Sequence, residues 1–263
     1  MLGPQCRGDS GQGSMTMVRV ADCDALVLCG GQGRRLRSVV KDRPKPMVMI
    51  DDRPFVDRVL DYCTGQGVRR VILCTGYLGD QFYEWYAAHP QSCDVRFSCE
   101  QVPLGTAGAL KHAASLIRTN PFMVLNGDSL CEVDLQALLS RHTATTGPVT
   151  LALTPADSRT DAGCATVNHA GRLTAFSETQ PDREIRFHNA GIYVCDRAVL
   201  DRIPAGRPYS LEQDLLPGLL TEGIYGHVFY QPLYDIGTPE RLDAFIRQTE
   251  AGVGGGVAKR NLR

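Results

Sequence analysis

The stretch ALVLCGGQGRRL at residues 25–36 joins a short apolar run to a glycine-rich turn that ends in two arginines. The apolar residues 25–28 predict a buried strand, because a continuous apolar run of this length is typical of a strand covered on both faces. Gly30, Gly31 and Gly33 allow the backbone to close around a phosphate group and point its N–H groups at the oxygens. Ligands of open α/β sheets bind beyond the carboxyl ends of the strands, so this turn predicts an anion-binding site.

The same alternation of apolar and amphipathic segments continues along the chain. Strands are predicted at residues 25–28, 71–74, 95–99, 122–125, 150–153, 165–167, 173–176, 190–195 and 225–230. Helices are predicted at residues 54–66, 80–88, 106–117, 134–142, 211–220 and 239–250. Apolar strands separated by helices favour a mostly parallel sheet with both faces covered. We expect one α/β domain over residues 21–250, a flexible extension over 1–20 and a flexible tail over 251–263.

The composition limits the classes of partner. The chain has 263 residues, 43% of them hydrophobic, and a formal net charge of −1, so no global basic field favours nucleic acid or an anionic membrane. No apolar run is long enough for a membrane span. Ten cysteines contain no C-x-x-C pair and the histidines show no zinc-binding spacing. We interpret the cysteines as reduced core residues of a cytoplasmic protein.

A second basic segment follows the glycine turn. Lys45 lies between Pro44 and Pro46, on a backbone that the prolines stiffen, in a chain where lysine is rare. The choice of lysine indicates that a compact ammonium is needed there. A glycine turn and a basic loop could each be a solvated surface. Together, glycines, arginines and Pro-Lys-Pro at this spacing favour a site for a triphosphate.

Five segments resemble, in order, the motifs of the sugar-phosphate nucleotidylyltransferases. They are GGQGRRL with PKP at 30–36 and 44–46, PLGTAGA at 103–109, NGD at 126–128, NAGIY at 189–193 and YDIGTPE at 234–240. The resemblance extends over residues 24–246. It implies a Rossmann-like three-layer α/β/α nucleotidyltransferase fold with a central, mostly parallel mixed sheet. It also implies an enzyme that joins a nucleoside triphosphate to a sugar 1-phosphate and releases pyrophosphate.

The resemblance also implies a role for individual residues. Arg35 steadies the departing pyrophosphate, Lys45 neutralises charge between the reacting phosphates, and Asp128 acts as a catalytic and metal-binding residue. Asp128 and Asp235 hold Mg²⁺, a hard cation that prefers oxygen ligands. The implied nucleotide-binding residues are Leu28, Gly30, Gly31, Gly33, Arg34, Glu100, Pro103, Gly105, Thr106 and Gly127. The implied sugar-binding residues are Asn126, Glu178, Asn189 and Gly191. Taken alone, Asp128 could close a turn and Asp235 could cap a helix.

The base and the sugar are less sharply indicated. Glu100 ends a predicted strand, and its carboxylate could accept from the N1–H and N2–H₂ edge of guanine or from N3–H of uracil. Residues 36–47 and 210–214 most resemble the D-glycero-D-manno-heptose 1-phosphate guanylyltransferases, which favours GTP and heptose 1-phosphate. Branches that use GTP, UTP or dTTP with mannose, glucose, N-acetylmuramate or cyclitol phosphates have overlapping motifs. The resemblance leaves a homo-oligomer open.

One position departs from the family pattern. Thr179 stands where many members have a lysine that binds the sugar's phosphate, and Arg172, Arg183 or Arg186 are candidates to supply that charge. A catalytically silent regulatory subunit would be expected to lack Arg35, Lys45 or a metal aspartate, and this chain has all of them. A nicotinamide-dependent oxidoreductase and a P-loop kinase are disfavoured, because neither G-x-G-x-x-G nor G-x-x-x-x-G-K-[ST] occurs.

Overall fold

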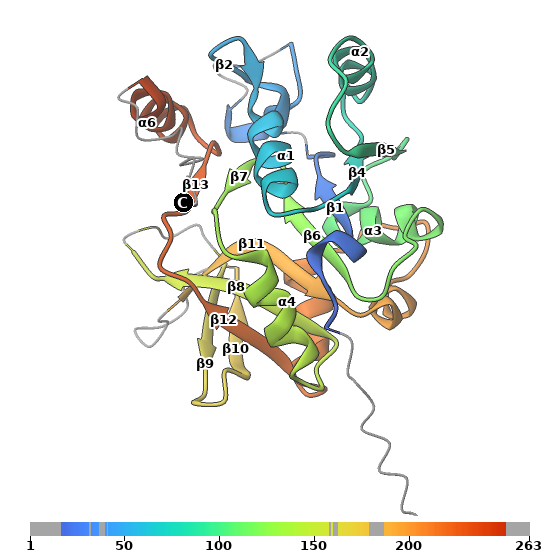
Figure 1. Ribbon diagram of the computed structural model, residues 1–263, viewed down its shortest axis with the longest axis vertical. Coiled ribbons are helices and arrows are strands. Elements are labelled where there is room, and N and C mark those ends of the chain that lie inside the picture. The colour runs from blue at the N-terminus through green and yellow to red at the C-terminus, as the bar shows by residue number, and fades with distance from the viewer. Residues whose placement is uncertain are drawn as a thin grey trace, which may run out of the picture.

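The computed structural model describes residues 17–31, 33–36, 40, 42–157, 159, 163–178 and 187–250. A nine-stranded sheet runs through the molecule, and helices lie on both of its faces (Figure 1). Strand β1 (Asp24–Leu28) pairs in parallel with β4 (Arg70–Thr75) and β6 (Phe122–Asn126), and β4 pairs in parallel with β5 (Asp94–Cys99). These four strands therefore end at the same edge of the sheet.

The remaining strands extend the sheet beyond β6. Strand β11 (Phe187–Cys195) pairs antiparallel with β6 and carries the rest of the sheet. That part contains β8 (Val149–Pro155), β9 (Cys164–Val167), β10 (Leu173–Ser177) and β12 (Ile224–Val228). The sheet is mixed, as predicted: four parallel strands are grouped around β1, and β12 pairs in parallel with β8 beyond β11.

Six α-helices accompany the sheet in the described residues. They are α1 (Phe55–Gly65), α2 (Asp80–Ala88), α3 (Gly105–His112), α4 (Leu135–Thr143), α5 (Leu216–Leu219) and α6 (Pro239–Glu250). Single-turn 3₁₀ helices are η1 (Val20–Asp22), η2 (Arg34–Leu36), η3 (Lys45–Met47) and η4 (Ala113–Ser115), the longer η5 covers Arg197–Arg202, and η6 (Leu211–Leu215) is a π-helix. Two short antiparallel strand pairs complete the fold, β2 (Met49–Ile50) with β3 (Arg53–Pro54), and β7 (Ser129–Leu130) with β13 (Tyr234–Asp235), which comes from far along the chain.

Alternation along β1 shows why the sheet needs helices on both faces. Val27 packs into a core that includes Phe55 of α1 and Leu138 of α4, whereas Leu26 packs into a second core that includes Leu110 of α3. Successive side chains of a strand point to opposite faces, so an all-apolar strand requires two cores. Burying one such leucine fully contributes about 1.5–3 kcal/mol. The predicted three-layer α/β/α architecture is confirmed.

Two predicted helices differ from their predicted form. The helix expected over 106–117 leaves α geometry after His112 and continues as η4. The helix expected over 211–220 begins as the π-helix η6 and becomes α5 at Leu216. Pro217 lies in the first turn of α5, where its missing N–H is tolerated, and it cannot donate a hydrogen bond back to a carbonyl of η6.

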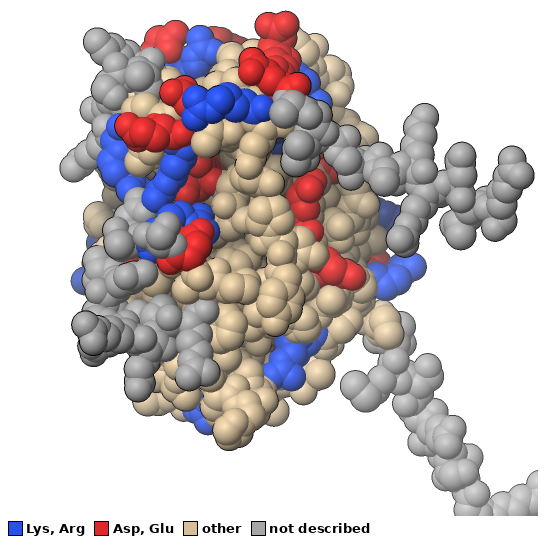
Figure 2. Space-filling view, turned by 90° about the vertical axis from the view of Figure 1, so that its left-hand side faces the viewer, with Lys and Arg blue, Asp and Glu red and all other residues tan. Residues whose placement is uncertain are grey.

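The surface and the cysteines agree with the composition. Figure 2 shows acidic and basic side chains of both signs intermixed on one face, which therefore presents no uniformly basic surface. No described helix has the length and apolar character needed to cross a membrane. None of the nine cysteines among the described residues forms a disulfide, and seven of them are buried. Burial raises the pKa of Cys74 to about 12, so this thiol stays protonated near neutral pH.

Candidate active site

Three cavities of about 240, 180 and 260 Å³ lie at the carboxyl edge of the parallel strands, and Asp128 lines all three. We call them the phosphate cavity, the sugar cavity and the base cavity, after the role that the motifs imply. Asp128 lies in the two-residue turn between β6 and β7. The cavities therefore adjoin at one carboxylate, at the edge where an open α/β sheet binds ligands.

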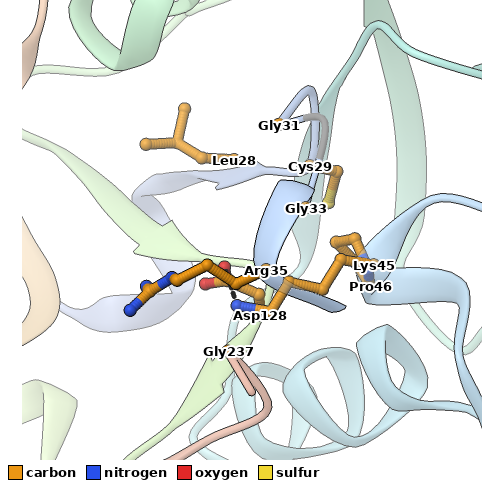
Figure 3. Close-up of a pocket in the computed structure, with 9 residues that line it drawn as sticks. All are labelled: Leu28, Cys29, Gly31, Gly33, Arg35, Lys45, Pro46, Asp128 and Gly237. Carbon is orange, nitrogen blue, oxygen red and sulfur yellow. Dashed lines mark hydrogen bonds and ion pairs between the residues drawn. The ribbon is translucent and has the colours of Figure 1, made fainter. Parts of the chain in front are cut away.

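The phosphate cavity brings the two basic segments together, as Figure 3 shows. Arg35 comes from η2 and Lys45 from η3. The Lys45 Nζ donates to Asp128 Oδ2 at 2.7 Å, and its side chain is only 11% exposed. Gly33 has a φ of +56°, and a Cβ there would lie 3.0 Å from Lys45 Cβ. Glycine at this position therefore lets the loop approach the lysine closely.

The second carboxylate reaches the same place through the short strand pair. Asp235 is opposite Ser129 in the β13–β7 pair, and the Ile236 N–H donates to the Asp128 carbonyl at 3.2 Å. Arg241 Nη1 donates to both carboxylate oxygens of Asp235, at 3.1 and 3.0 Å. Residues far apart in the sequence thus bring two carboxylates and several cations to one edge of the sheet.

These two carboxylates are the candidate ligands for a metal ion. No group of three or more His, Cys, Asp or Glu side chains that could hold a metal occurs among the described residues. Mg²⁺ in phosphate-binding sites is commonly held by one or two carboxylates, with substrate phosphates and water as the other ligands. Asp128 and Asp235 fit that pattern, since both are oxygen ligands and both line the sugar cavity.

The base cavity is built around Glu100, which follows β5. Its N–H donates to the Thr75 carbonyl at 2.9 Å, and its Oε2 accepts from the Leu104 N–H at 3.2 Å. A Cβ on Gly30 would lie 2.9 Å from Glu100 Oε1, and one on Gly76 would lie 2.8 Å from Glu100 Cγ. Both glycines thus leave room for the carboxylate. Burial raises the pKa of Glu100, although the Leu104 N–H and His112 oppose the shift.

The rest of the base cavity comes from the start of α3 and the ends of β1 and β6. Its other lining residues are Leu28, Gly30, Gly31, Pro103, Gly105, Thr106, Ala109, Asn126 and Asp128. Gly127 does not line the three cavities, and its N–H donates to the Leu28 carbonyl at 2.9 Å. A Cβ there would lie 2.6 Å from Cys29 Sγ, so Gly127 permits close packing of the two turns.

The sugar cavity contains the predicted residues Asn126, Glu178, Asn189 and Gly191. The β11–β8 register shifts between Asn189 and Tyr193, and Gly191 within this bulge has a φ of +71°. A Cβ on Gly191 would lie 2.6 Å from Asn126 Nδ2. The bulge and the glycine therefore bring β11 close to the end of β6, as bulges near binding sites commonly do.

Sequence reasoning missed three charged residues of this cavity, Arg159, Glu212 and Arg241. Glu212 lies in the segment 210–214, whose resemblance to the heptose branch indicated no role for the carboxylate. It is 8% exposed, and burial raises its pKa while the Thr106 hydroxyl opposes the shift. Arg159 pairs with Asp157 at 2.9 Å and Arg241 pairs with Asp235. Such arginines carry no motif, because only the tertiary fold brings them to the cleft.

The arginines suggested in place of the family lysine have a different outcome. Arg172 does not line the sugar cavity, and its Nη2 donates to the carbonyl oxygens of Leu220 and Thr221, at 3.5 and 2.9 Å. The expectation that it supplies the phosphate charge is not supported. Thr179, Arg183 and Arg186, and the side chain of Arg34, lie outside the described part of the chain.

Comparison with known proteins gives consistent results. The chain is 38% identical over 221 residues to mannose-1-phosphate guanylyltransferase from Mycobacterium tuberculosis, a match covering 82% of this chain and 62% of that protein. It is 34% identical over 218 residues to D-glycero-alpha-D-manno-heptose 1-phosphate guanylyltransferase from Aneurinibacillus thermoaerophilus, covering 82% of this chain and 94% of that protein. The chain therefore spans less than two thirds of the first of these relatives and nearly all of the second.

A solved structure matches the fold as well. The crystal structure of HddC from Yersinia pseudotuberculosis has a TM-score of 0.77 and 30% identity, and the match covers 86% of this chain and 99% of that one. A structure of the same protein complexed with GMP-PN has a TM-score of 0.76. The sequence pattern of the family described as Nucleotidyl transferase matches residues 24–251. The chain belongs to the nucleotidyl transferase family.

Proposed function

We propose that this chain is a sugar-1-phosphate guanylyltransferase, which joins GTP to a sugar 1-phosphate and releases pyrophosphate. The observation that carries the proposal is the convergence of Arg35, Lys45, Asp128 and Asp235 at one cleft. All four line the sugar cavity, which shares Asn126 and Asp128 with the base cavity. The relatives named above are guanylyltransferases of mannose and heptose 1-phosphates, which supports both halves of the reaction.

The reaction requires two anions to meet. A phosphate oxygen of the sugar 1-phosphate attacks the α-phosphorus of GTP, and the bond to the pyrophosphate oxygen breaks. Such transfers depend mainly on positioning and on charge neutralisation, so no protein nucleophile is needed. Lys45 is nearly buried beside Asp128, where a positive charge is screened less than on the surface. Arg35, which lines both the phosphate and the sugar cavity, adds a second cation.

Mg²⁺ would neutralise phosphate charge when bound, and Asp128 and Asp235 are the residues that would hold it. Each aspartate also accepts a hydrogen bond from a cationic side chain of the protein, Asp128 from Lys45 and Asp235 from Arg241. Lys45 is therefore kept at the position where phosphate charge must be met, by the same carboxylate that would bind the metal. Residues of the chain thus supply a fixed electrostatic frame for the substrates.

Guanine is the base that fits the geometry best. Glu100 lines the base cavity with a half-buried carboxylate, which only accepts hydrogen bonds when ionised. Guanine offers two adjacent kinds of donor, N1–H and N2–H₂, whereas uracil offers N3–H alone. For the sugar we propose D-glycero-α-D-manno-heptose 1-phosphate, supported by the segments 36–47 and 210–214 and by the 34% identical relative. Mannose 1-phosphate is the second candidate, supported by the 38% identical relative.

A matrix assay tests the proposal. The protein is incubated with Mg²⁺ and each of GTP, UTP, dTTP, CTP and ATP, against heptose, mannose and glucose 1-phosphates, and pyrophosphate release is followed. We expect the highest rate with GTP and heptose 1-phosphate, and no release with free mannose, which lacks the attacking phosphate. Failure to release pyrophosphate with any pair would contradict the function and favour a regulatory subunit. A clear preference for another nucleotide would contradict the role of Glu100.

A further inference from the structure

A chain of buried and partly buried hydrogen bonds links the base cavity to the sugar cavity. It runs from Thr106 at the start of α3, through Glu212 in η6 and Tyr193 in β11, to Asn189 at the bulge of β11. The Thr106 Oγ1 donates to Glu212 Oε2 at 2.7 Å, and the Tyr193 hydroxyl donates to Glu212 Oε1 at 3.2 Å. Asn189 Nδ2 donates to the Tyr193 hydroxyl at 2.6 Å. Thr106 lines the base cavity, and Asn189 and Glu212 line the sugar cavity.

The direction of each hydrogen bond is fixed by its neighbours. The Gly191 N–H donates to Asn189 Oδ1 at 3.0 Å, which leaves the amide nitrogen to face Tyr193. The Tyr193 hydroxyl accepts from that nitrogen, so its own proton points to Glu212. The Thr106 hydroxyl likewise accepts from the Leu211 N–H at 2.7 Å, so it donates its own hydrogen bond to Glu212. Both carboxylate oxygens must therefore accept, which a carboxylate does and an amide cannot.

Backbone contacts attach the same segment to residues 103–109, which we call the base loop. The N–H groups of Ala107 and Gly108 both donate to the Tyr209 carbonyl at 3.0 Å, and the Tyr209 N–H donates to the Leu104 carbonyl at 2.8 Å. Gly105 has a φ of +72°, and a Cβ there would lie 2.8 Å from the Tyr209 oxygen. The base loop is thus hydrogen-bonded to, and closely packed against, the residues just before Glu212.

The local helix form is a separate sign that Glu212 is held for a purpose. Glu212 lies in a π-helix, a rare form that occurs often at functional sites. The Ser210 hydroxyl accepts from the N–H groups of Glu212 and Gln213, at 3.2 and 3.0 Å, and donates to Glu212 Oε2 at 3.2 Å. The next residue, Gln213, donates to Glu178 of the sugar cavity at 2.9 Å. The carboxylate therefore has a defined position between the two cavities.

We propose that Glu212 is a positioning residue that couples the two substrate sites, so that each substrate binds more tightly when the other is present. This inference rests on the proposed function, since it assumes a nucleotide in the base cavity and a sugar phosphate in the sugar cavity. When a nucleotide orders Thr106, the hydrogen bonds through Glu212 and Tyr193 also order Asn189. When a sugar phosphate orders Asn189, the same hydrogen bonds order Thr106. Coupling between sites is reciprocal by thermodynamic necessity.

Binding of a non-reacting nucleotide measures this coupling without turnover. The probe is GTP with a methylene group between the α- and β-phosphorus atoms, which cannot release pyrophosphate. Its Kd is measured by calorimetry with Mg²⁺, alone and with a saturating sugar 1-phosphate, either mannose 1-phosphate or the heptose compound if the matrix assay prefers it. We expect the wild-type Kd to fall about fivefold or more when the sugar phosphate is present.

Two substitutions break the chain at different links. Glu212→Gln places an amide donor against a hydroxyl donor, and Tyr193→Phe removes the link to Asn189 while retaining the fully buried ring. In both variants the ratio of the two Kd values should lie within about twofold of one. Tyr62→Phe is the matched control, because it removes another buried tyrosine hydroxyl, which donates to the Val133 carbonyl at 2.8 Å. This control should keep the wild-type ratio even if its melting temperature falls.

The possible outcomes are distinct. If the two Kd values of the wild-type protein are equal, the coupling role is overturned. It is also overturned if Tyr193→Phe and Glu212→Gln both keep the Kd ratio of the wild type. If Glu212→Gln fails to fold, Tyr193→Phe alone decides, since its ring still fills the core. A wild-type protein that binds both ligands with coupling but releases no pyrophosphate would contradict the proposed function and leave the coupling standing.

Discussion

Lys45 shows how much one side chain can contribute at this cleft. Its ammonium lies 2.7 Å from Asp128, and the flanking prolines restrict the backbone of η3 that carries it. A charge that is held in place before the reaction costs no reorganisation when phosphate charge builds up. A fixed ammonium beside Asp128 is therefore a physical reason for lysine at this position, in a chain where lysine is rare.

Substitution of Lys45 should slow the chemical step. We predict that Lys45→Ala lowers kcat for pyrophosphate release about 10²–10³-fold, the cost of losing one fixed stabilising group. Lys45→Arg should recover only part of the rate, because a planar guanidinium does not replace a compact ammonium. Lys111→Ala is the control, since Lys111 donates to the Leu200 carbonyl away from the cleft. A wild-type kcat in Lys45→Ala would exclude Lys45 from catalysis.

Glu100 predicts a pH dependence of nucleotide use. Burial raises its pKa above the ordinary value of 4.5, so it becomes protonated at a higher pH than an exposed glutamate. The protonated form would lose an acceptor for the guanine donors. We therefore expect kcat/KM for GTP to fall as pH is lowered, with a midpoint above 4.5. Glu100→Gln should have a lower kcat/KM and lack this acidic limb.

The measurement for Glu100 is a profile of kcat/KM for GTP between about pH 5 and 8, with circular dichroism as the check that both proteins stay folded. The same acidic limb in Glu100→Gln would mean that another group titrates. In that case the carboxylate would not be the acceptor for the base.

At the scale of elements, the bulge of β11 sets how closely this strand approaches Asn126 of β6 in the sugar cavity. Gly191 combines a positive φ with a close approach to Asn126, whereas Gly206 has a similar φ of +72° and open space around its Cβ position. A substitution at Gly206 therefore tests backbone strain alone, whereas one at Gly191 adds a steric conflict with Asn126. An L-residue in the left-handed region costs about 1–2 kcal/mol at either position.

We predict that Gly191→Ala raises KM for the sugar 1-phosphate, because the new methyl group must displace the Asn126 side chain. Gly206→Ala should lower stability by a similar strain term and leave KM unchanged. Urea denaturation and steady-state kinetics on both variants provide the comparison. Equal KM values in the two variants would show that the contact at Gly191 has no bearing on sugar binding.

The short elements are the ones that the sequence could not reveal. Helices α2 and α6 have the bounds that periodicity predicts, because each has at least two turns of amphipathic pattern. Strands β7 and β13 have two residues each, too few to show any period. Yet this pair brings Asp235 beside Asp128, a proximity that only the resemblance to known motifs had suggested. The roles of Asp128 in catalysis and of both aspartates in metal binding stay predictions.

Side chains that reach the sugar cavity from distant segments could not be predicted, for a different reason. Arg159 and Arg241 reach the sugar cavity because the fold brings their segments to Asp235, and neither has a sequence pattern of its own. Glu212 was visible as a residue of a recognisable segment. Its position between Thr106 and Tyr193 depends on contacts more than 15 residues apart in sequence, which residue patterns do not encode.

At the scale of the whole molecule, stability depends on helices packed on both faces of the sheet. His142 of α4 is buried, with Nδ1 3.0 Å from Thr150 Oγ1 on β8 and Nε2 3.5 Å from Asp196 beyond β11. Burial lowers the pKa of His142 below 6.5, although Asp196 opposes the shift. The unfolded chain therefore takes up a proton more readily than the folded protein as pH falls.

This linkage predicts a loss of stability in acid. A histidine whose folded pKa is lowered destabilises the fold as pH falls from the unfolded pKa towards the folded pKa. We expect the free energy of unfolding to decrease between about pH 7.5 and 5.5, and His142→Gln to reduce the decrease. Urea denaturation of both proteins at the two pH values tests this. An equal decrease in the variant would assign the effect to other groups.

The proposed reaction depends on two carboxylates from distant segments, Asp128 and Asp235, serving one nucleotide. The most direct test is Mg²⁺-dependent pyrophosphate release from GTP and the preferred sugar 1-phosphate, in wild type, Asp128→Asn and Asp235→Asn. Each substitution preserves side-chain shape and removes one negative charge. We predict that turnover falls by about two orders of magnitude or more in both variants, with an unchanged circular dichroism spectrum. Near-normal turnover in both would contradict a shared metal and triphosphate site.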